Sequence, residues 1–180
     1  MKFIDFLNEK TKINIAKDFA QYKHAYQYRK FSKEEYFKHP SRVADTVARF
    51  TKDEDTIIAA WSHDTLEDTK TSQEELDAVF GDKVLKIVQE LTSVKSDIVK
   101  IGKAQYLLKK MQKMSSEALL IKLCDRLDNV SDFNVASEKF RKKYIKETYY
   151  ILENLTRPLK SYHKKIIQEI VTQLQIWDNK

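Results

Sequence analysis

Ser62-His63-Asp64-Thr65-Leu66-Glu67-Asp68-Thr69 is the stretch around which the rest of the chain is organised. The adjacent His63 and Asp64 offer one nitrogen and one oxygen ligand, a pair that suits manganese, iron or zinc better than calcium. On a helix, Glu67 and Asp68 follow His63 and Asp64 by four residues, so each lies over one of them on the same face. The stretch predicts carboxylates beside a metal-bound water, an arrangement typical of a hydrolase. A solvated helix end could carry the same residues, so further ligands are needed to decide.

Two more candidate ligands lie far from this stretch. His39 precedes it at His39-Pro40, and Asp125 follows it inside the apolar helical run Leu119-Leu120-Ile121-Lys122-Leu123-Cys124-Asp125. A carboxylate near a core costs free energy unless it has a partner, and a metal ion supplies one. With His63 and Asp64 these residues give the order His, His-Asp, Asp, which resembles the ligand pattern of the HD metal-dependent phosphohydrolases.

Three longer blocks, in order from about residue 20 to residue 132, resemble the hydrolase domain of the RelA/SpoT-type enzymes. The resemblance extends along the helical tail to the small stand-alone alarmone hydrolases, which include a metazoan SpoT homologue. The first block contains His24-Ala25, Arg29-Lys30, Tyr36-Phe37-Lys38-His39-Pro40 and Val43-Ala44; the second contains Ile58-Ala59-Ala60-Trp61 running into the quoted stretch, then Glu74-Glu75-Leu76 and Phe80-Gly81; the third is Ile121-Lys122-Leu123-Cys124-Asp125-Arg126-Leu127-Asp128-Asn129.

This resemblance implies an all-α fold and one HD-type domain over residues 1–180. The implied reaction removes the 3′-pyrophosphate from guanosine 3′,5′-bis(diphosphate) or its pentaphosphate relative, giving GDP or GTP and pyrophosphate. Because no nucleotidyl-transfer segment follows, hydrolysis alone is expected. One divalent ion, manganese in the family, would bind to His39, His63, Asp64 and Asp125. Glu67 and Asp68 would deprotonate the water or protonate the leaving ribose oxygen, and their proximity should raise the pKa of at least one of them.

Arg29-Lys30 form a basic pair ahead of a predicted capping box, Ser32-Lys33-Glu34-Glu35. Such a pair suits a polyanionic nucleotide, because a guanidinium group both forks onto phosphate and stacks on a base. In the family the matching arginine packs against guanine. Here, however, the family's Ser-Gly-Glu-Pro-Tyr is replaced by a segment one residue longer that has no Gly or Pro, so the sequence leaves base specificity open. By the same resemblance, the other expected substrate-binding residues are Lys95, Arg126, Asn129, Arg141 and Tyr144.

The composition of the 180 residues favours one compact helical domain. Two glycines and two prolines are too few for a protein of many turns and short strands. The single cysteine, Cys124, excludes an internal disulfide and is expected in the core. No apolar run reaches the roughly 18 residues of a membrane span, and the first eight residues are too short and too acidic for a secretory signal. These features predict a cytoplasmic protein.

Apolar spacing and end signals predict helices over residues 3–28, from His39-Pro40 to Phe50, from Ile57 to the His-Asp pair, over 72–80 and 84–91, after Ser115, and twice in the tail, broken at Arg157-Pro158. Thr92 to Lys110 is basic and has no apolar periodicity, which indicates a mobile loop with a helix start.

Two other functions stay open. A related HD enzyme could act on another phosphate ester, such as a deoxynucleoside monophosphate or a nicotinamide dinucleotide phosphate. A basic helical module could instead bind nucleic acid, with the HD residues vestigial. The net charge of +6 favours anionic partners in general. Since no helix-turn-helix signature or aromatic-basic pattern stands out, we expect a nucleotide substrate and neither a nucleic-acid nor a membrane partner; the sequence leaves the oligomeric state open.

Overall fold

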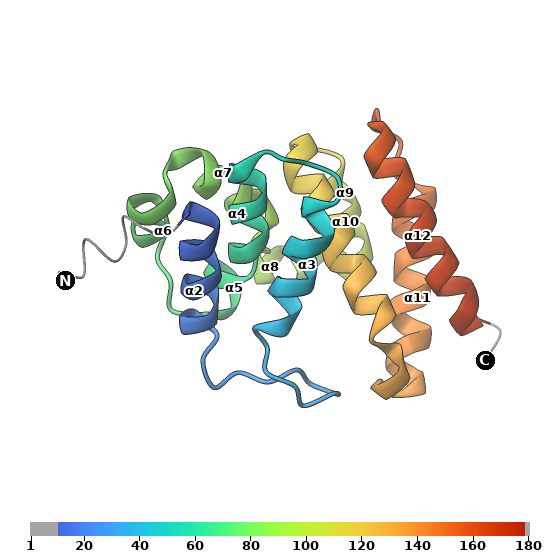
Figure 1. Cartoon of the computed structure of the whole chain (residues 1–180). Helices are drawn as coiled ribbons and strands as arrows, with labels where there is room; N and C mark the ends of the chain where they lie inside the picture. Colours follow the sequence, from blue (N-terminus) through green and yellow to red (C-terminus); the bar gives the residue numbers. More distant parts are fainter. Residues whose placement is uncertain (1–10, 179–180) are drawn as a thin grey trace, which may run out of the picture. The chain divides into compact units, whose positions relative to one another are not determined.

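The computed structural model of the chain describes residues 11–178, which form α-helices joined by turns (Figure 1). In these residues the only β feature is an isolated bridge between Tyr28 and Glu35, so the predicted all-α fold is confirmed. The elements are α2 (Lys12–Lys23), α3 (Lys38–Ala48), α4 (Glu54–Ser62), α5 (Thr65–Asp68), α6 (Gln73–Phe80), α7 (Asp82–Leu91), α8 (Lys95–Ile101), α9 (Lys103–Met111), α10 (Ser116–Ser131), the 3-10 turn η1 (Phe133–Val135), α11 (Glu138–Glu153) and α12 (Ser161–Asp178).

Packing divides the described chain into two compact units. The first contains the described residues as far as Tyr28, together with Glu34–Thr92. The second contains Arg29–Lys33 and the described residues from Ser93 onward. The prediction that the whole chain forms a single domain stays a prediction.

Helix α4 is the centre of the first unit. It packs against α2, α3 and α7, and every residue from Thr56 to Ser62 is buried. A helix enclosed on several sides has no water-facing stripe, which explains its nearly continuous apolar sequence. The Asp53 side chain caps it by accepting a hydrogen bond from the Thr56 backbone N–H at 3.1 Å. His63 is the C-cap of this buried helix, so the imidazole of the His-Asp pair is held at the end of a rigid element.

Helix α3 brings the other predicted histidine ligand into the first unit. Its buried side consists of His39, Pro40, Val43, Ala44 and Val47, at spacings of three and four residues. Pro40 lies in the first turn, where its missing N–H removes no helical hydrogen bond. Because α3 packs against α4, both predicted histidine ligands stand on neighbouring helices of one unit.

The second unit is built on two helix pairings, α10 with α12 and α9 with α11. Helix α10 is capped by the Ser115 hydroxyl, which accepts from the Ala118 N–H at 3.1 Å. Ile166, Ile170 and Leu174 form the buried stripe of α12, four residues apart. The predicted break between the two tail helices at Arg157-Pro158 is confirmed, since α11 ends at Glu153 and α12 begins at Ser161.

The helix predicted over residues 3–28 is only partly borne out. Residues 3–10 lie outside the described residues. In the described part of the chain, the helix α2 ends at Lys23, five residues before the predicted end. His24 caps the helix, and Tyr26 adopts a positive φ of 65°, a left-handed conformation that an α-helix cannot continue through.

The mobile loop predicted from Thr92 to Lys110 is wrong. This segment folds into α8 and α9, separated at Gly102, whose φ of 82° favours glycine. Tyr106, Leu107 and Met111 are the buried residues of α9. The Tyr106 hydroxyl also accepts a hydrogen bond from the Val94 N–H at 2.8 Å, which ties α9 to the residue before α8. Closely spaced lysines hide this short apolar stripe in the sequence.

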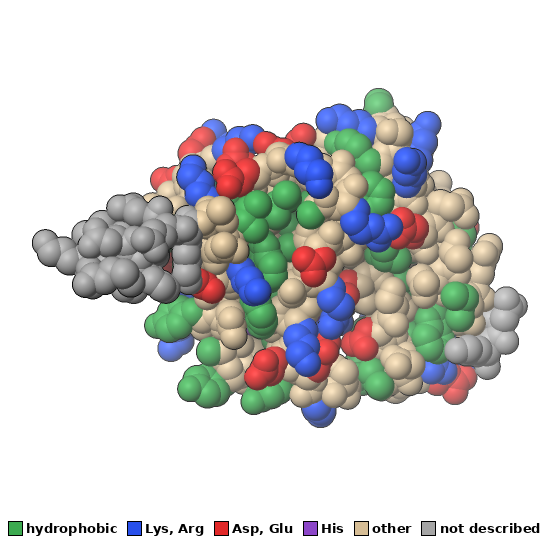
Figure 2. Space-filling view, viewed as in Figure 1, with side chains coloured by type: hydrophobic (Ala, Val, Ile, Leu, Met, Phe, Trp, Pro, Cys, Tyr) green, Lys and Arg blue, Asp and Glu red, His purple; other side chains and the backbone are tan. Residues whose placement is uncertain are grey.

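The histidines are buried, whereas the surface carries charged side chains of both signs. All four histidines are buried, and none is visible on the face drawn in Figure 2, where basic and acidic side chains alternate. Cys124 is a buried thiol rather than half of a disulfide, as expected for a core residue. Among residues 11–178, no helix is both long and apolar enough to cross a bilayer.

Candidate metal centre and active site

His39 and His63 face each other inside the first unit. Their side chains come from α3 and from the end of α4, and their ring centroids are 5.2 Å apart. Only 1% of His39 and 2% of His63 is exposed. Two imidazoles this close and this well shielded from water can direct a ring nitrogen each at one metal ion.

The surroundings of His63 fix which ring nitrogen carries the proton. Nδ1 lies 2.8 Å from the Ala60 carbonyl oxygen, which can only accept, so Nδ1 is the donor. In the neutral ring Nε2 therefore has a free lone pair, and this atom is buried without a hydrogen-bond partner among the described residues. A buried ring nitrogen of this kind is the feature expected of a metal ligand whose other nitrogen is held by a carbonyl.

Asp64 supplies an oxygen at the same point. Its Oδ2 lies 3.0 Å from His63 Nε2 and 3.6 Å from His39 Nε2. Ligands bound at about 2.0–2.2 Å to one ion are spaced by roughly 3 Å, so these separations suit a shared cation. A divalent ion would also balance the carboxylate charge and engage the lone pair of His63. His39, His63 and Asp64 therefore fit a divalent metal ion by both donor type and spacing.

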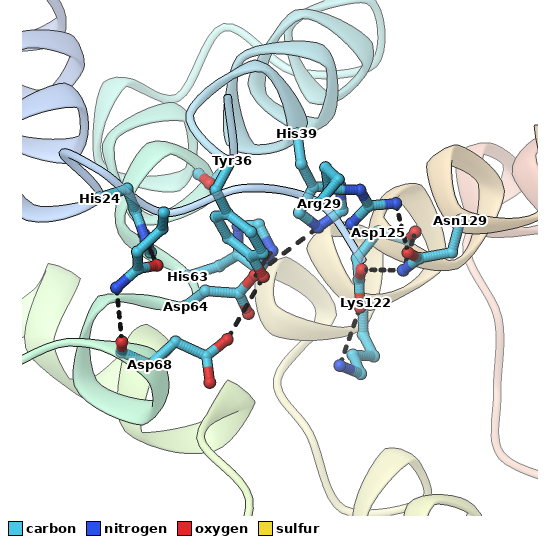
Figure 3. A network of polar contacts seen from close by, with 12 residues as sticks. His24, Arg29, Tyr36, His39, His63, Asp64, Asp68, Lys122, Asp125 and Asn129 are labelled. Atoms are coloured by element: carbon cyan, nitrogen blue, oxygen red, sulfur yellow. Dashed lines mark hydrogen bonds and ion pairs between the residues drawn. The ribbon is translucent and has the colours of Figure 1, made fainter. Parts of the chain in front are cut away.

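Tyr36 joins this cluster, although the sequence did not mark it as a site residue. Its hydroxyl donates to Asp64 Oδ2 at 2.7 Å and lies 3.3 Å from Asp68 Oδ2 (Figure 3). Its ring meets that of His39 edge to face, with centroids 5.8 Å apart. Tyr36 lies in the turn before α3, so no helical spacing to His39 marked it in the sequence. Tyr36 thus connects a predicted ligand to a predicted catalytic carboxylate.

Glu67 and Asp68 lie on the single turn α5, which Asp64 precedes. The chain leaves α4 before this turn, but the Asp68 N–H donates to the Asp64 carbonyl at 2.9 Å and so keeps the predicted one-turn spacing. Burial, then the charge of Asp64 and that of Glu67, raise the pKa of Asp68, while the Tyr36 hydrogen bond opposes the rise. The expected upward shift within the carboxylate pair is confirmed in direction.

His24 makes structural contacts within the first unit. Its Nδ1 lies 2.9 Å from Gln27 Oε1, and Gln27 in turn donates to the Asp68 carbonyl at 2.9 Å. The His24 ring stacks at a tilt on Tyr36, with centroids 4.8 Å apart. Burial lowers the pKa of His24 and so favours its neutral form. His24 therefore packs against Tyr36, and Gln27 contacts the end of α5.

Asp125 belongs to the second unit and is 8% exposed. Lys122 donates to its Oδ2 at 2.9 Å, and Asn129 donates to its Oδ1 at 2.6 Å (Figure 3). Asn129 receives a hydrogen bond from Arg29 at 3.0 Å, and Arg29 lies 3.7 Å from the Asp132 carboxylate. Lys122 was not predicted as a site residue; its signal was the spacing of three residues to Asp125. The carboxylate is thus oriented from both sides before any ligand binds.

Arg126 and Tyr144 contact each other within the second unit. Arg126 is 2% exposed, donates to the Thr148 hydroxyl at 2.7 Å and stacks over the Tyr144 ring at 4.9 Å. Burial raises the pKa of Tyr144, so its hydroxyl stays protonated at neutral pH. These contacts hold α10 to α11, and a role of either residue in substrate binding stays a prediction.

Three basic residues predicted to bind substrate occupy different surroundings. Lys30 is exposed, with its ammonium 5.4 Å from the Phe31 ring centre. Lys95 is exposed at the first position of α8. Arg141 lies over the Trp177 ring at 5.5 Å. Their contacts with substrate stay predictions.

Residues 16–159 match the model of a family described as the HD domain. The chain belongs to the HD-domain family. It is a homologue of guanosine-3′,5′-bis(diphosphate) 3′-pyrophosphohydrolases: it is 38% identical to the Aquifex aeolicus protein of that name over 92% of this chain, and 34% identical to mouse MESH1, a protein with the same designation, over 71% of this chain and 72% of the mouse protein.

A solved HD-domain structure supports the same assignment. It is that of a metazoan orthologue of SpoT that hydrolyses ppGpp, and it superposes with a TM-score of 0.80 at 30% identity, covering 91% of this chain and 96% of the other. The chain spans only 23% of the length of the Aquifex protein. The HD domain is thus the part that the chain shares with its longer relatives.

Proposed function

We propose that this HD domain hydrolyses guanosine 3′,5′-bis(diphosphate) and its pentaphosphate relative at the 3′-pyrophosphate, giving GDP or GTP and pyrophosphate. The observation that carries the proposal is the convergence of two buried imidazole nitrogens on Asp64 Oδ2, in a chain homologous to hydrolases of that substrate. The relatives' names supply the substrate class, and the first unit supplies the chemistry that such a substrate needs.

One divalent ion, Mn²⁺ in the favoured form of the proposal, would be held by His39, His63, Asp64 and Asp125. The first three converge within one unit, and Asp125 is a buried carboxylate already oriented by Lys122 and Asn129. Mixed nitrogen and oxygen ligands suit manganese, iron and zinc, so the choice of metal needs a direct test. When bound, the ion lowers the pKa of a water ligand and balances phosphate charge.

The side chains around this centre provide the proton transfers. One of Glu67 and Asp68 accepts a proton from the attacking water as the oxygen of that water forms a bond to the phosphorus atom. The bond between that phosphorus and the ribose 3′ oxygen breaks, and the other carboxyl group returns a proton to the ribose oxygen. Tyr36 holds Asp64 and approaches Asp68 through one hydroxyl, so it keeps the ligand and the proton-transfer group in fixed relation.

Substrate contacts are proposed for Arg29, Lys30, Lys95, Arg126, Asn129, Arg141 and Tyr144. Arg29 is the best supported of these, because Asn129 and Asp132 hold its guanidinium in place. A guanidinium with a fixed plane loses less freedom when it stacks on a base or forks onto a phosphate. Arg126 is the least accessible member of the set.

The decisive experiment measures pyrophosphate release by the Mn²⁺-loaded protein from guanosine 3′,5′-bis(diphosphate). Glu67→Gln should lower the rate by about 100-fold or more, the size expected when general acid-base help is removed. Glu74→Gln, which neutralises an exposed carboxylate of α6, is the matched control and should leave the rate unchanged. Faster turnover of a deoxynucleoside monophosphate or of NADPH in the same panel would reject the guanosine assignment and retain the HD hydrolase.

A further inference from the structure

The positive charge of the chain is concentrated in one short stretch of the second unit. Residues 93–113 contain six lysines and one aspartate, a net charge of +5 out of +6 for all 180 residues. The sequence suggested a mobile basic loop here, whereas the structure folds the stretch into α8 and α9. Folding fixes the spacing of these charges, so they form a surface of defined shape.

One groove of this surface has a volume of about 430 Å³ and runs beside the junction of α8 and α9. Its basic lining residues are Lys100, Lys109, Lys110 and Lys113. Asp97 is its one acidic member, and that carboxylate is already paired with Lys100 at 3.3 Å. Ile101 and Tyr106 also line it, so the groove combines apolar and cationic side chains.

A second groove, of about 600 Å³, lies between the start of α9 and α11. Lys103, Lys143 and Lys146 line it, and its single carboxylate, Glu147, lies 3.8 Å from Lys143. Ile101 belongs to both grooves, which therefore adjoin one another. We refer to the two together as the lysine channel. Lys113 lines the first groove of the channel and Lys143 lines the second.

Most of the channel's charge is not balanced within the protein. Among residues 11–178, no carboxylate forms an ion pair with Lys103, Lys109, Lys113 or Lys146. Lysines crowded along one helix and its neighbour repel one another, and an anionic partner would relieve that repulsion while releasing its own counterions. Tyr150, which is 41% exposed, adds an aromatic surface to the second groove.

We propose that the lysine channel binds the phosphate backbone of a single-stranded nucleic acid, a partner that the sequence alone did not lead us to expect. Two adjoining concave grooves suit an extended, flexible polyanion, whereas a bilayer presents a flat surface and a single nucleotide would occupy only one groove. Lysines that follow a backbone, with an aromatic ring within reach of the bases, are the usual elements of strand binding without sequence preference. The inference is independent of the hydrolytic reaction, because it uses none of the residues assigned to it.

The test is fluorescence anisotropy with a labelled single-stranded RNA of about 12 nucleotides, within the usual site size for such grooves. The wild type should bind, and the logarithm of its affinity should fall linearly with the logarithm of salt concentration. The double variant Lys109→Gln, Lys113→Gln should bind several-fold more weakly, with a salt slope shallower by ~0.7 for each phosphate that a lysine no longer neutralises. The matched control, Lys164→Gln with Lys165→Gln, removes two exposed lysines from α12 and should bind like the wild type.

Equal binding by the two double variants would overturn the proposal, because the affinity would then reflect net charge alone. Absence of salt-dependent binding by the wild type would overturn it as well. Vesicles of phosphatidylglycerol and phosphatidylcholine form a second arm, and preference for vesicles over RNA would assign the channel to membranes instead. Far-UV circular dichroism of each variant shows that the fold is intact.

Discussion

The Tyr36 hydroxyl donates a hydrogen bond to Asp64 Oδ2 at 2.7 Å, the oxygen on which two histidine rings also converge. A phenol has one proton to donate, so the more distant Asp68 Oδ2, at 3.3 Å, competes for it. The shorter contact helps to orient the Asp64 carboxylate. Tyr36 is not itself a candidate metal ligand, but its hydrogen bond orients the candidate ligand Asp64.

Removing only this hydroxyl should weaken metal binding. For Tyr36→Phe we expect an affinity for Mn²⁺ at least about 10-fold lower, the loss typical of groups that orient a metal ligand. Titration calorimetry with MnCl₂ measures the change without depending on activity. Tyr26→Phe, at a tyrosine that is 94% exposed, is the matched control. Unchanged affinity in Tyr36→Phe would show that Asp64 does not need this hydrogen bond.

Metal binding should stabilise the fold, and His63 should be required for it. An ion present at about 100 times its dissociation constant adds ~2.7 kcal/mol to the free energy of unfolding. We therefore expect Mn²⁺ to raise the melting temperature by several degrees and excess chelator to reverse the rise. In His63→Ala the increase in melting temperature should be absent, because Nε2 of His63 is the atom whose lone pair would bind the ion. An equal rise in this variant would place the metal elsewhere.

The chemistry of the site was easier to predict than the contacts that support it. His39, His63 and Asp64 were predicted from their order along the chain, which resembles the ligand pattern of the HD phosphohydrolases, and their binding of a metal ion stays a prediction. Tyr36 was missed because its hydrogen bond to Asp64 spans 28 residues and follows no helical period. Lys122 was missed because a lysine beside an aspartate on a helix resembles an ordinary surface pair.

The helices of the fold also differ in how well the sequence predicted them. The clean apolar spacing of Val84, Ile87, Val88 and Leu91 predicted α7, and all four residues are buried. Helix α9 buries only Tyr106, Leu107 and Met111, and the surrounding lysines mask that pattern. Local periodicity therefore predicted α7, whereas α8, which buries no residue, and α9, whose few buried residues lie among lysines, were predicted as a loop.

Protonation of His163 should make stability fall with acid. The Lys160 N–H donates to its Nδ1 at 3.2 Å and its Nε2 lies 2.9 Å from the Ser116 carbonyl, so the buried ring fits only as a neutral donor and acceptor. Burial lowers the pKa of His163, so the unfolded chain binds its proton more readily. The contribution is complete above the unfolded pKa of about 6.5 and is lost as the pH falls below it, by at most ~1.4 kcal/mol per pH unit.

Urea unfolding of the metal-free protein between pH 8 and pH 5 measures this dependence. His24 shifts in the same direction, so the informative quantity is the difference between the wild type and His163→Gln. Glutamine retains one donor and one acceptor but does not titrate. The variant should lose less stability than the wild type over this range. Parallel curves for the two proteins would mean that His163 does not contribute.

Thr148 should matter for stability because it satisfies a buried guanidinium. The Arg126 Nη1 donates to its hydroxyl at 2.7 Å, and Arg126 Nε already lacks a hydrogen-bond partner among the described residues. Thr148→Val keeps the shape and removes the acceptor, which should lower the free energy of unfolding by about 1.5–3 kcal/mol, as measured by urea denaturation. Thr172→Val removes a similar hydroxyl, one that bonds the Gln168 carbonyl on the exposed side of α12, and should cost little. Equal losses in the two variants would argue against a buried structural role for Arg126 and would leave it free to act on substrate.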